Sequence, residues 1–220
     1  MSARTHWESV YGCKSAESVS WYAAHLAASL HYIRRASASA KAAVIDVGGG
    51  ESTLVDDLLA EGYPDITVLD ISAKALEVTR RRLGSLARQV SWEAADVLEA
   101  ELPAHRYDVW HDRAVFHFLT TDDQRHRYVA QVLRALKPGG FAIVGTFGPD
   151  GPQTCSGLPV SRYAPGELHG VFGEPFQLID SSVDVHTTPS GSPQQFVYCF
   201  CRRADQQVQE SRPVMSAPGG

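Results

Sequence analysis

The stretch AAVIDVGGGESTL, residues 42–54, decides the fold. Its β-branched run predicts a strand over 43–47, and Ser52 begins an apolar periodicity that predicts a helix over 52–62. Three consecutive glycines lie between these two elements, at a position where the backbone can approach a ligand closely. The stretch therefore predicts a nucleotide-binding turn at the start of a strand–helix–strand unit.

The alternation of strands and helices continues along the chain. Strands are predicted over 65–70, 89–96, 107–112 and 141–147, and helices over 72–84 and 121–140. Two later runs, 176–188 and 194–203, are too close together for a crossover helix and predict an antiparallel pair. We therefore expect an α/β, Rossmann-like doubly wound sheet that is mostly parallel and ends in a C-terminal antiparallel β-hairpin.

Length and composition indicate one globular domain. The chain has 220 residues, of which 44% are hydrophobic, enough for a sizeable core. We expect a single domain over 1–203 with a helical N-terminal lid over 1–40, and a disordered tail over 204–220. The net charge of −5 gives no reason to expect a nucleic-acid partner. The N-terminus has no secretory signal core, no apolar run suits a membrane span, and the four cysteines are irregularly placed. A cytoplasmic location is expected.

The glycine turn does not fit two common phosphate-binding patterns. In G-x-G-x-x-G the third glycine position is occupied here by Thr53, and Asp46 would repel a pyrophosphate. No Lys-Ser/Thr pair follows, so the turn is not a Walker loop. Asp46 instead suits a ligand that carries an ammonium group.

Four features, in this order and spacing, carry a family resemblance. They are D-x-G-x-G at Asp46, Asp70 at the end of the second strand, Asp96 after the third, and LKPGG before the fifth. Over roughly residues 40–203 the chain resembles the class I S-adenosylmethionine-dependent methyltransferases. The resemblance implies a seven-stranded sheet, S-adenosyl-L-methionine as cofactor and S-adenosyl-L-homocysteine as product.

The resemblance implies a cofactor site made of Asp46, Gly48, Gly49, Gly50, Asp70, Ile71, Asp96, Val97 and Asp112. In this site the glycines lie against the methionine part, and Asp46 binds the ammonium group, which Asp112 can share. Asp70 accepts from the ribose hydroxyls, and Asp96 binds the adenine amino group beside Val97. Two alternatives stay open: Asp70 as the cap of the following helix, and Asp96 as an ordinary loop residue.

The acceptor is expected near the ends of the fourth and fifth strands. His111 and His117 are candidate catalytic bases, or structural histidines of the loop. Arg113 either anchors an anionic acceptor or pairs with Asp112. Cys155 is a candidate ligand for a metalloid acceptor, or an incidental thiol.

Aromatic side chains of the N-terminal segment can reach the same place. Trp7, Tyr11, Trp21 and Tyr22 either line a lid or form the core of that segment, and Tyr22 is taken as a substrate contact. Cys199 and Cys201 share one strand face and are expected to pack in the core. We expect no metal.

These features predict methyl transfer to an acceptor, with a small molecule as the first choice of acceptor. Protein lysine N-methylation and methylation of a thiol or metalloid are the alternatives. The segment WHDRAVFHFLT, 110–120, is similar to the D-R-G segment of thiopurine-type S-methyltransferases and to the matching segment of elongation-factor lysine methyltransferases, with Ala114 in place of the glycine. A non-catalytic cofactor-binding protein is disfavoured because the glycine turn is intact.

Overall fold

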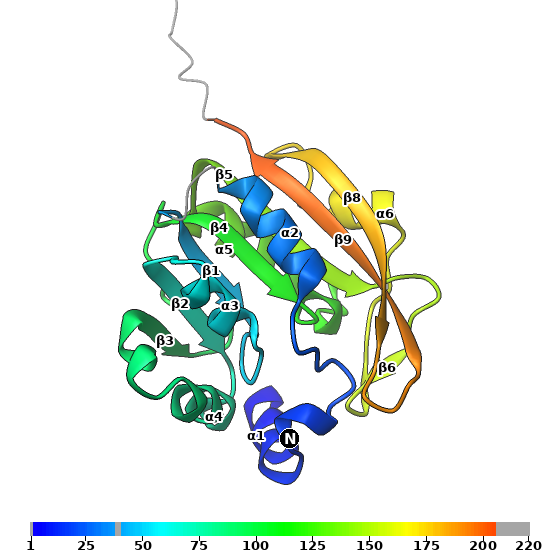
Figure 1. Ribbon diagram of the computed structural model, residues 1–220. Helices are drawn as coiled ribbons and strands as arrows, with labels where there is room; N and C mark the ends of the chain where they lie inside the picture. The colour runs from blue at the N-terminus through cyan, green and yellow to red at the C-terminus, as the bar shows by residue number, and fades with distance from the viewer. Residues whose placement is uncertain (1, 38–40, 206–220) are drawn as a thin grey trace, which may run out of the picture.

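The computed structural model describes residues 2–37 and 41–205 and contains one seven-stranded sheet (Figure 1). The strand order is β3-β2-β1-β4-β5-β9-β8. The strands are β1 (Ala43–Val47), β2 (Asp65–Asp70), β3 (Val90–Ala94), β4 (Tyr107–Arg113), β5 (Leu136–Phe147), β8 (Phe176–Thr187) and β9 (Pro193–Arg203), and β6 (Thr154–Cys155) pairs with β7 (Leu158–Pro159) in a separate hairpin.

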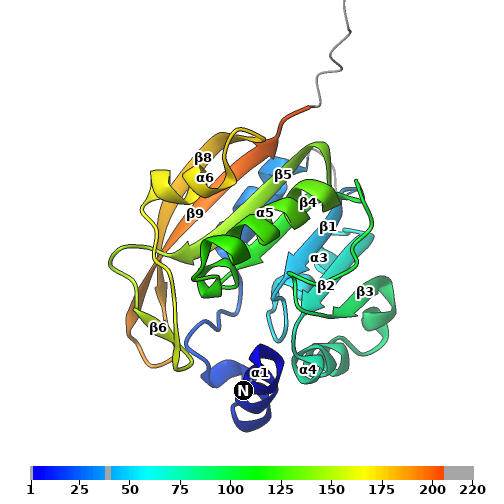
Figure 2. The ribbon, with the colours of Figure 1, turned by 180° about the vertical axis from the view of Figure 1, so that it is seen from behind.

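Helices cover both faces of the sheet, as in a doubly wound fold. Helices α2, α3 and α4 bury one apolar face, while α5 and α6 bury the other, which Figure 2 shows from behind. The helices are α1 (Ala3–Cys13), α2 (Ala27–Ala36), α3 (Leu54–Ala60), α4 (Ala73–Leu83), α5 (Asp122–Ala135) and α6 (Pro165–Phe172), with short 3₁₀ helices η1 (Ala16–Ser18), η2 (Gly84–Gln89) and η3 (Phe116–Phe118).

The predicted fold class is confirmed. Strands β1 to β5 pair in parallel, and β9 pairs antiparallel with both β5 and β8. The strand order reverses between β1 and β4, and in open α/β sheets a ligand binds at the carboxyl ends of the strands at such a switch point. The candidate site is therefore expected beside Val47 and Arg113, the last residues of these two strands.

One predicted boundary is wrong. The helix expected over 121–140 ends at Ala135, and β5 already begins at Leu136. The carbonyl of Ala135 accepts from the backbone N–H of Arg106 at 2.9 Å, and Leu136 pairs with Tyr107, so the neighbouring strand draws the chain into the sheet. The N-terminal start at Thr121 is confirmed, including its reciprocal capping with Gln124.

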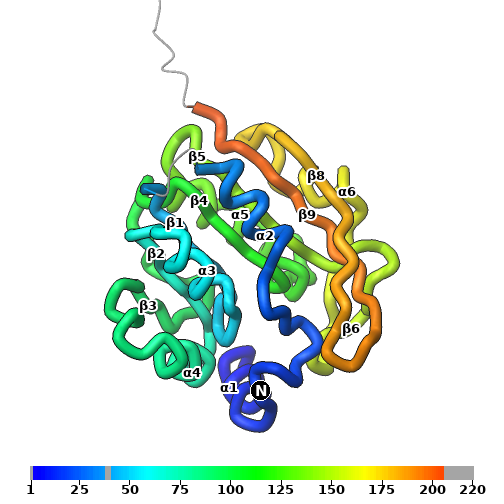
Figure 3. Tube along the Cα trace, in the orientation of Figure 1, coloured from blue at the N-terminus to red at the C-terminus, as the bar shows by residue number. Residues whose placement is uncertain are grey.

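The N-terminal segment divides into two parts. Helix α1 lies at the end of the sheet where β1, β2 and β4 finish, and the chain then crosses to α2, which packs on the sheet against β4 and β5 (Figure 3). No helix within 2–37 and 41–205 is both long and apolar enough to cross a membrane. The predicted tail, 204–220, lies outside the described residues beyond Asp205.

Candidate active site

Two glycines fix the shape of the turn after β1. Gly48 has a φ of +70° and Gly50 a φ of +22°, values that side chains rarely adopt. A Cβ on Gly48 would overlap Val115, and a Cβ on Gly50 would lie 2.7 Å from Asp70 Oδ2. Both Gly48 and Gly49 donate backbone N–H groups to Leu69 O, at 2.7 and 3.3 Å. The turn therefore lies directly against the end of β2, and only glycine fits at positions 48 and 50.

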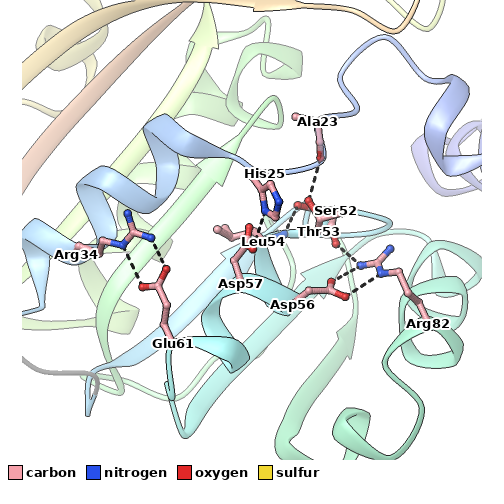
Figure 4. Close-up of polar contacts among 10 residues, drawn as sticks. All are labelled: Ala23, His25, Arg34, Ser52, Thr53, Leu54, Asp56, Asp57, Glu61 and Arg82. Atoms are coloured by element: carbon pink, nitrogen blue, oxygen red, sulfur yellow. Dashed lines mark hydrogen bonds and ion pairs between the residues drawn. The ribbon is translucent and has the colours of Figure 1, made fainter.

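The end of the turn is held from two sides, as Figure 4 shows. Arg82 of α4 donates to Ser52 O at 2.6 Å and pairs with Asp56 at 2.7 Å. From the other side, Thr53 Oγ1 donates to Ala23 O at 3.0 Å. Arg82 also donates to Glu51 O at 3.0 Å. The turn is thus fastened to α4 and to the segment that leads into α2.

Two cavities meet at the turn. The larger cavity is lined by residues that include Trp7, Asp70, Ile71, Asp96, Val97 and Cys155, and the smaller by residues that include Tyr22, Asp46, Gly49, Glu51 and His111. Tyr11, Trp21, Gly48 and Arg113 line both. The site therefore has two adjoining compartments of different chemistry, with Gly48 at the junction.

The smaller cavity is acidic. Asp46 and Glu51 are 2% and 6% exposed. Asp46 Oδ2 and Glu51 Oε2 are both buried and have no hydrogen-bond partner among the described residues. A buried carboxylate oxygen without a donor is costly, so these two oxygens fit a ligand group that donates hydrogen bonds and carries positive charge. An ammonium group meets both conditions.

Asp70 lies in the wall of the larger cavity. Its Oδ1 accepts from the backbone N–H of Ser72 at 2.8 Å, while Ser72 itself caps α4 through Ala75. Burial and, to a smaller extent, the nearby Asp46 raise the pKa of the Asp70 carboxyl to about 7, against the opposing effect of the backbone N–H groups of Ser72 and Gly50. The helix-cap alternative fails in its simple form, because Ser72 is the cap and Asp70 supports it.

The next acid along this edge is Asp96. Its Oδ1 accepts from the backbone N–H of Leu98 at 2.9 Å, and Asp96 lines the larger cavity together with Ile71 and Val97. The apolar side chains of Ile71, Val97 and Leu98 flank it there. A flat base between apolar side chains, with a carboxylate at its edge, fits this part of the cavity.

Aromatic side chains cover the larger cavity. Trp7 lies 5.8 Å from Tyr11, 6.0 Å from Trp21 and 5.1 Å from Phe118, measured between ring centroids. Burial raises the pKa of the Tyr11 phenol well above its usual value, so the hydroxyl stays protonated. We call α1 and the segment up to Ala23, residues 3–23, the lid. Within the predicted lid over 1–40, α2 packs on the sheet instead of over the cavity.

His111 and Asp112 point to opposite sides of β4, as neighbouring strand residues do. His111 lines the smaller cavity, where Nδ1 lies 2.7 Å from Asp46 Oδ1 and Nε2 lies 2.8 Å from Ser29 Oγ. Asp112 is fully buried on the other face and accepts from Val115 N at 2.9 Å and Tyr128 OH at 2.5 Å. Burial raises the pKa of its carboxyl to about 6. The structure thus brings His111, and not Asp112, together with Asp46.

His117 is enclosed by aromatic rings. Its ring centroid lies 4.4 Å from that of Phe118 and 4.5 Å from that of Phe147. Burial, together with the positive charge of Arg113, lowers the pKa of the imidazole to about 3. His117 does not appear among the described residues that line either cavity. It lies behind the cavity wall, while Phe118 faces the cavity.

Arg113 and Cys155 also line the larger cavity. Arg113 Nη1 donates to Trp21 O at 2.9 Å, and its guanidinium lies 4.3 Å from the centre of the Phe196 ring. Within the described residues no carboxylate forms an ion pair with Arg113, so the alternative of a pairing with Asp112 is absent. Burial raises the pKa of the Cys155 thiol to about 11, which keeps it protonated near neutral pH. Cys199 and Cys201 pack in the core on the α5 side.

Sequence reasoning missed three contributors to this site. Glu51 directly follows the glycines, and an acid at that position was a signal that could have been used. Ser29 and Phe118 gave no signal, because only tertiary packing brings them to the site. In the described part of the chain, no cluster of three or more His, Cys, Asp or Glu side chains suits a metal ion.

Comparison with known proteins also points to a methyltransferase domain. A family model described as a methyltransferase domain matches residues 44–140. The mouse "eEF1A lysine and N-terminal methyltransferase" is 27% identical over 141 residues, which cover 61% of this chain and 20% of that protein. The chain therefore spans about a fifth of the length of this curated relative.

Two solved structures share the fold across nearly the whole chain. One, from work on the conversion of a disulfide bond into a thioacetal group during echinomycin biosynthesis, has a TM-score of 0.75 and 21% identity, and covers 94% of this chain and 95% of its own. The other is the 1,6-didemethyltoxoflavin-N1-methyltransferase of Burkholderia thailandensis with bound S-adenosylhomocysteine, at a TM-score of 0.68, 19% identity, and 92% and 87% coverage. Strand order, glycine turn and the methyltransferase-domain match over residues 44–140 are all consistent with a class I S-adenosylmethionine-dependent methyltransferase.

Proposed function

We propose that this protein transfers the methyl group of S-adenosylmethionine to a small, anionic acceptor. The observation that carries the proposal is the pair of adjoining cavities: an acidic compartment beside the glycine turn, and a larger one under an aromatic lid with the Arg113 guanidinium in its wall. When bound, the cofactor supplies a methyl group that its sulfonium centre has already activated.

The cofactor contacts follow from the chemistry of each compartment. Asp46 and Glu51 hold the ammonium group, since their free oxygens face the smaller cavity. The backbone of Gly48 to Gly50 leaves room for the methionine part, and Asp70 accepts from the ribose hydroxyls. Ile71, Asp96 and Val97 hold the adenine. Asp112 stays outside this set and supports the loop that follows β4.

The protein's own contribution is orientation and exclusion of water. His117, with its lowered pKa and apolar surroundings, is a poor proton acceptor, and both ring nitrogens of His111 already have partners. We therefore assign neither histidine to the acceptor step. An acceptor that is nucleophilic without help from a base fits the site, and holding it in line with the methyl group is the main source of rate.

The positive charge of Arg113 leads us to expect a negatively charged acceptor. A guanidinium without a carboxylate partner, half-buried in a cavity wall, favours a ligand with a carboxylate or another anionic group. The raised pKa of Cys155 disfavours a metalloid acceptor, since a soft metal or metalloid binds the thiolate. Cys155→Ser should therefore leave methyl transfer largely unchanged.

Protein lysine methylation is the second candidate, and the similarity to the mouse eEF1A lysine and N-terminal methyltransferase favours it. Two features of the site oppose it. The lid covers the larger cavity, so a lysine side chain would have to displace Trp7 or Trp21 to enter. In addition, Arg113 would repel the incoming ammonium.

Transfer of a labelled methyl group separates the two candidates. The protein is incubated with methyl-labelled cofactor and a cell extract that has been divided into small-molecule and protein fractions. The proposal predicts label in anionic small molecules, with loss of that transfer in Arg113→Gln at unchanged cofactor affinity. Label only in the protein fraction would replace it with the second candidate.

A further inference from the structure

A continuous row of buried side chains connects the smaller cavity to helix α2. Asp46 Oδ1 lies 2.7 Å from His111 Nδ1, and His111 Nε2 lies 2.8 Å from Ser29 Oγ. Ser29 Oγ in turn lies 3.2 Å from the hydroxyl of Tyr198 on β9. All four residues are at most 2% exposed. Because these contacts are shielded from solvent, each side chain restricts the orientation of the next.

The hydrogen bonds of this row can all run in one direction, with donation from Tyr198 toward Asp46. The Asp46 carboxylate only accepts, so His111 Nδ1 carries the proton. The other ring nitrogen of a neutral imidazole is an acceptor, and Ser29 O–H donates to it. The Ser29 oxygen then accepts from the hydroxyl of Tyr198.

We infer that His111 and Ser29 are positioning residues that hold Asp46 for the ammonium group of the cofactor. This inference rests on the proposed function. The ring takes up Oδ1 and leaves Oδ2 free and buried at the smaller cavity. The ring therefore orients the Asp46 carboxylate, and its second oxygen stays available to the incoming ammonium.

Through this row of side chains, the cofactor site depends on the position of α2. Ser29 lies in the first turn of α2, directly after the lid, and α2 packs against β4 and β5. Loss of the Ser29 hydroxyl leaves His111 Nε2 without a partner in a buried place, which costs the ring its fixed orientation. The effect should reach Asp46 although Ser29 does not line either cavity.

Two ligands distinguish positioning from general damage. S-adenosylhomocysteine carries the amino-acid end, and 5′-methylthioadenosine lacks it but keeps the adenosine part. In Ser29→Ala the affinity for S-adenosylhomocysteine should fall about tenfold, while the affinity for 5′-methylthioadenosine stays the same. His111→Asn, which keeps a donor toward Asp46, should lose less affinity for S-adenosylhomocysteine than His111→Ala.

Ser37→Ala is the matched control, because Ser37 is a hydrogen-bonded serine at the other end of α2. It should leave both affinities unchanged. Nitrogen chemical shifts of the His111 ring in the unsubstituted protein should show a proton on Nδ1 and none on Nε2. A wild-type protein that binds neither ligand would contradict the proposed function. If the wild type binds both ligands, a Ser29→Ala protein that loses both affinities equally, or neither, would contradict the positioning role alone, as would a proton on Nε2.

Discussion

Gly50 and Asp70 are packed so closely that a single methyl group on Gly50 would lie 2.7 Å from Asp70 Oδ2. The first residue belongs to the turn after β1, and the second ends β2. Two of the four features that carry the family resemblance, the glycine turn and Asp70, therefore lie in direct contact. A change in the turn must displace the acid proposed to bind the ribose.

Gly50→Ala tests this packing. The substitution places a Cβ against Asp70 at a φ of +22°, so the turn or the carboxylate must move. We expect the affinity for S-adenosylhomocysteine to fall by more than about tenfold, measured by calorimetry on the folded variant. Gly166→Ala is the control, since nothing lies near that position. Equal affinities in both variants would show that the turn tolerates a side chain.

Cofactor binding should release a proton from the Asp70 carboxyl. Its folded pKa of about 7 lies above the ordinary pKa of 3.8 for an aspartate carboxyl, so its stabilising contribution is full below pH 3.8 and is lost as pH rises through about 7. Ribose hydroxyls donate to the ionised carboxylate, so binding should lower this pKa and release a proton at about pH 6.

Calorimetry in two buffers of different protonation enthalpy measures that proton. 5′-Methylthioadenosine is the suitable ligand, because it leaves the acids of the smaller cavity uninvolved. Release should be seen in the wild type and be absent in Asp70→Asn, whose affinity should also be lower by roughly 1.5–3 kcal/mol. Release of the same size in both proteins would assign the proton to another group.

Arg82 should strengthen cofactor binding by supporting the backbone of the glycine turn. It donates to Glu51 O at 3.0 Å and Ser52 O at 2.6 Å from outside the cavities. Arg82→Gln should weaken binding of S-adenosylhomocysteine several-fold, because the end of the turn loses charge-assisted hydrogen bonds. Arg81→Gln, which removes an exposed ion pair with Glu77 on the same helix, should have no effect. Identical binding in the two variants would mean that the turn holds its shape alone.

The lid should control how long the cofactor stays bound. Trp7→Ala removes the ring that touches Tyr11, Trp21 and Phe118, and should raise the dissociation rate of S-adenosylhomocysteine about tenfold, equivalent to about 1.4 kcal/mol. Stopped-flow fluorescence measures the rate, with the exposed Ser9→Ala on the same helix as control. An unchanged rate would show that α1 plays no part in enclosing the ligand.

The sequence was informative wherever local patterns decide structure. The glycines at 48–50, the alternating strands and the helix starts near residues 72 and 121 depend on neighbouring residues, and the structure has them as expected. The end of α5 was missed because a neighbouring strand, and not the Lys-Pro-Gly-Gly sequence, determines it.

Side-chain direction at the site was harder to predict. His111 and Asp112 are adjacent in β4, and both looked available for the site. The pairing of β4 with β1 decides that His111 lies beside Asp46 and that Asp112 faces Tyr128. His117 likewise looked accessible in a loop, yet Phe118 and Phe147 enclose it. Such contacts depend on residues far apart in the chain, which a single sequence does not place.

Titration of the folded protein with S-adenosylhomocysteine, and in parallel with NAD, tests the central claim most directly. The two acids of the smaller cavity and the thoroughly packed glycine turn predict one bound S-adenosylhomocysteine per chain and no binding of the dinucleotide, because Asp46 repels a pyrophosphate. Binding of NAD, or no heat with S-adenosylhomocysteine from a protein shown to be folded, would contradict the account.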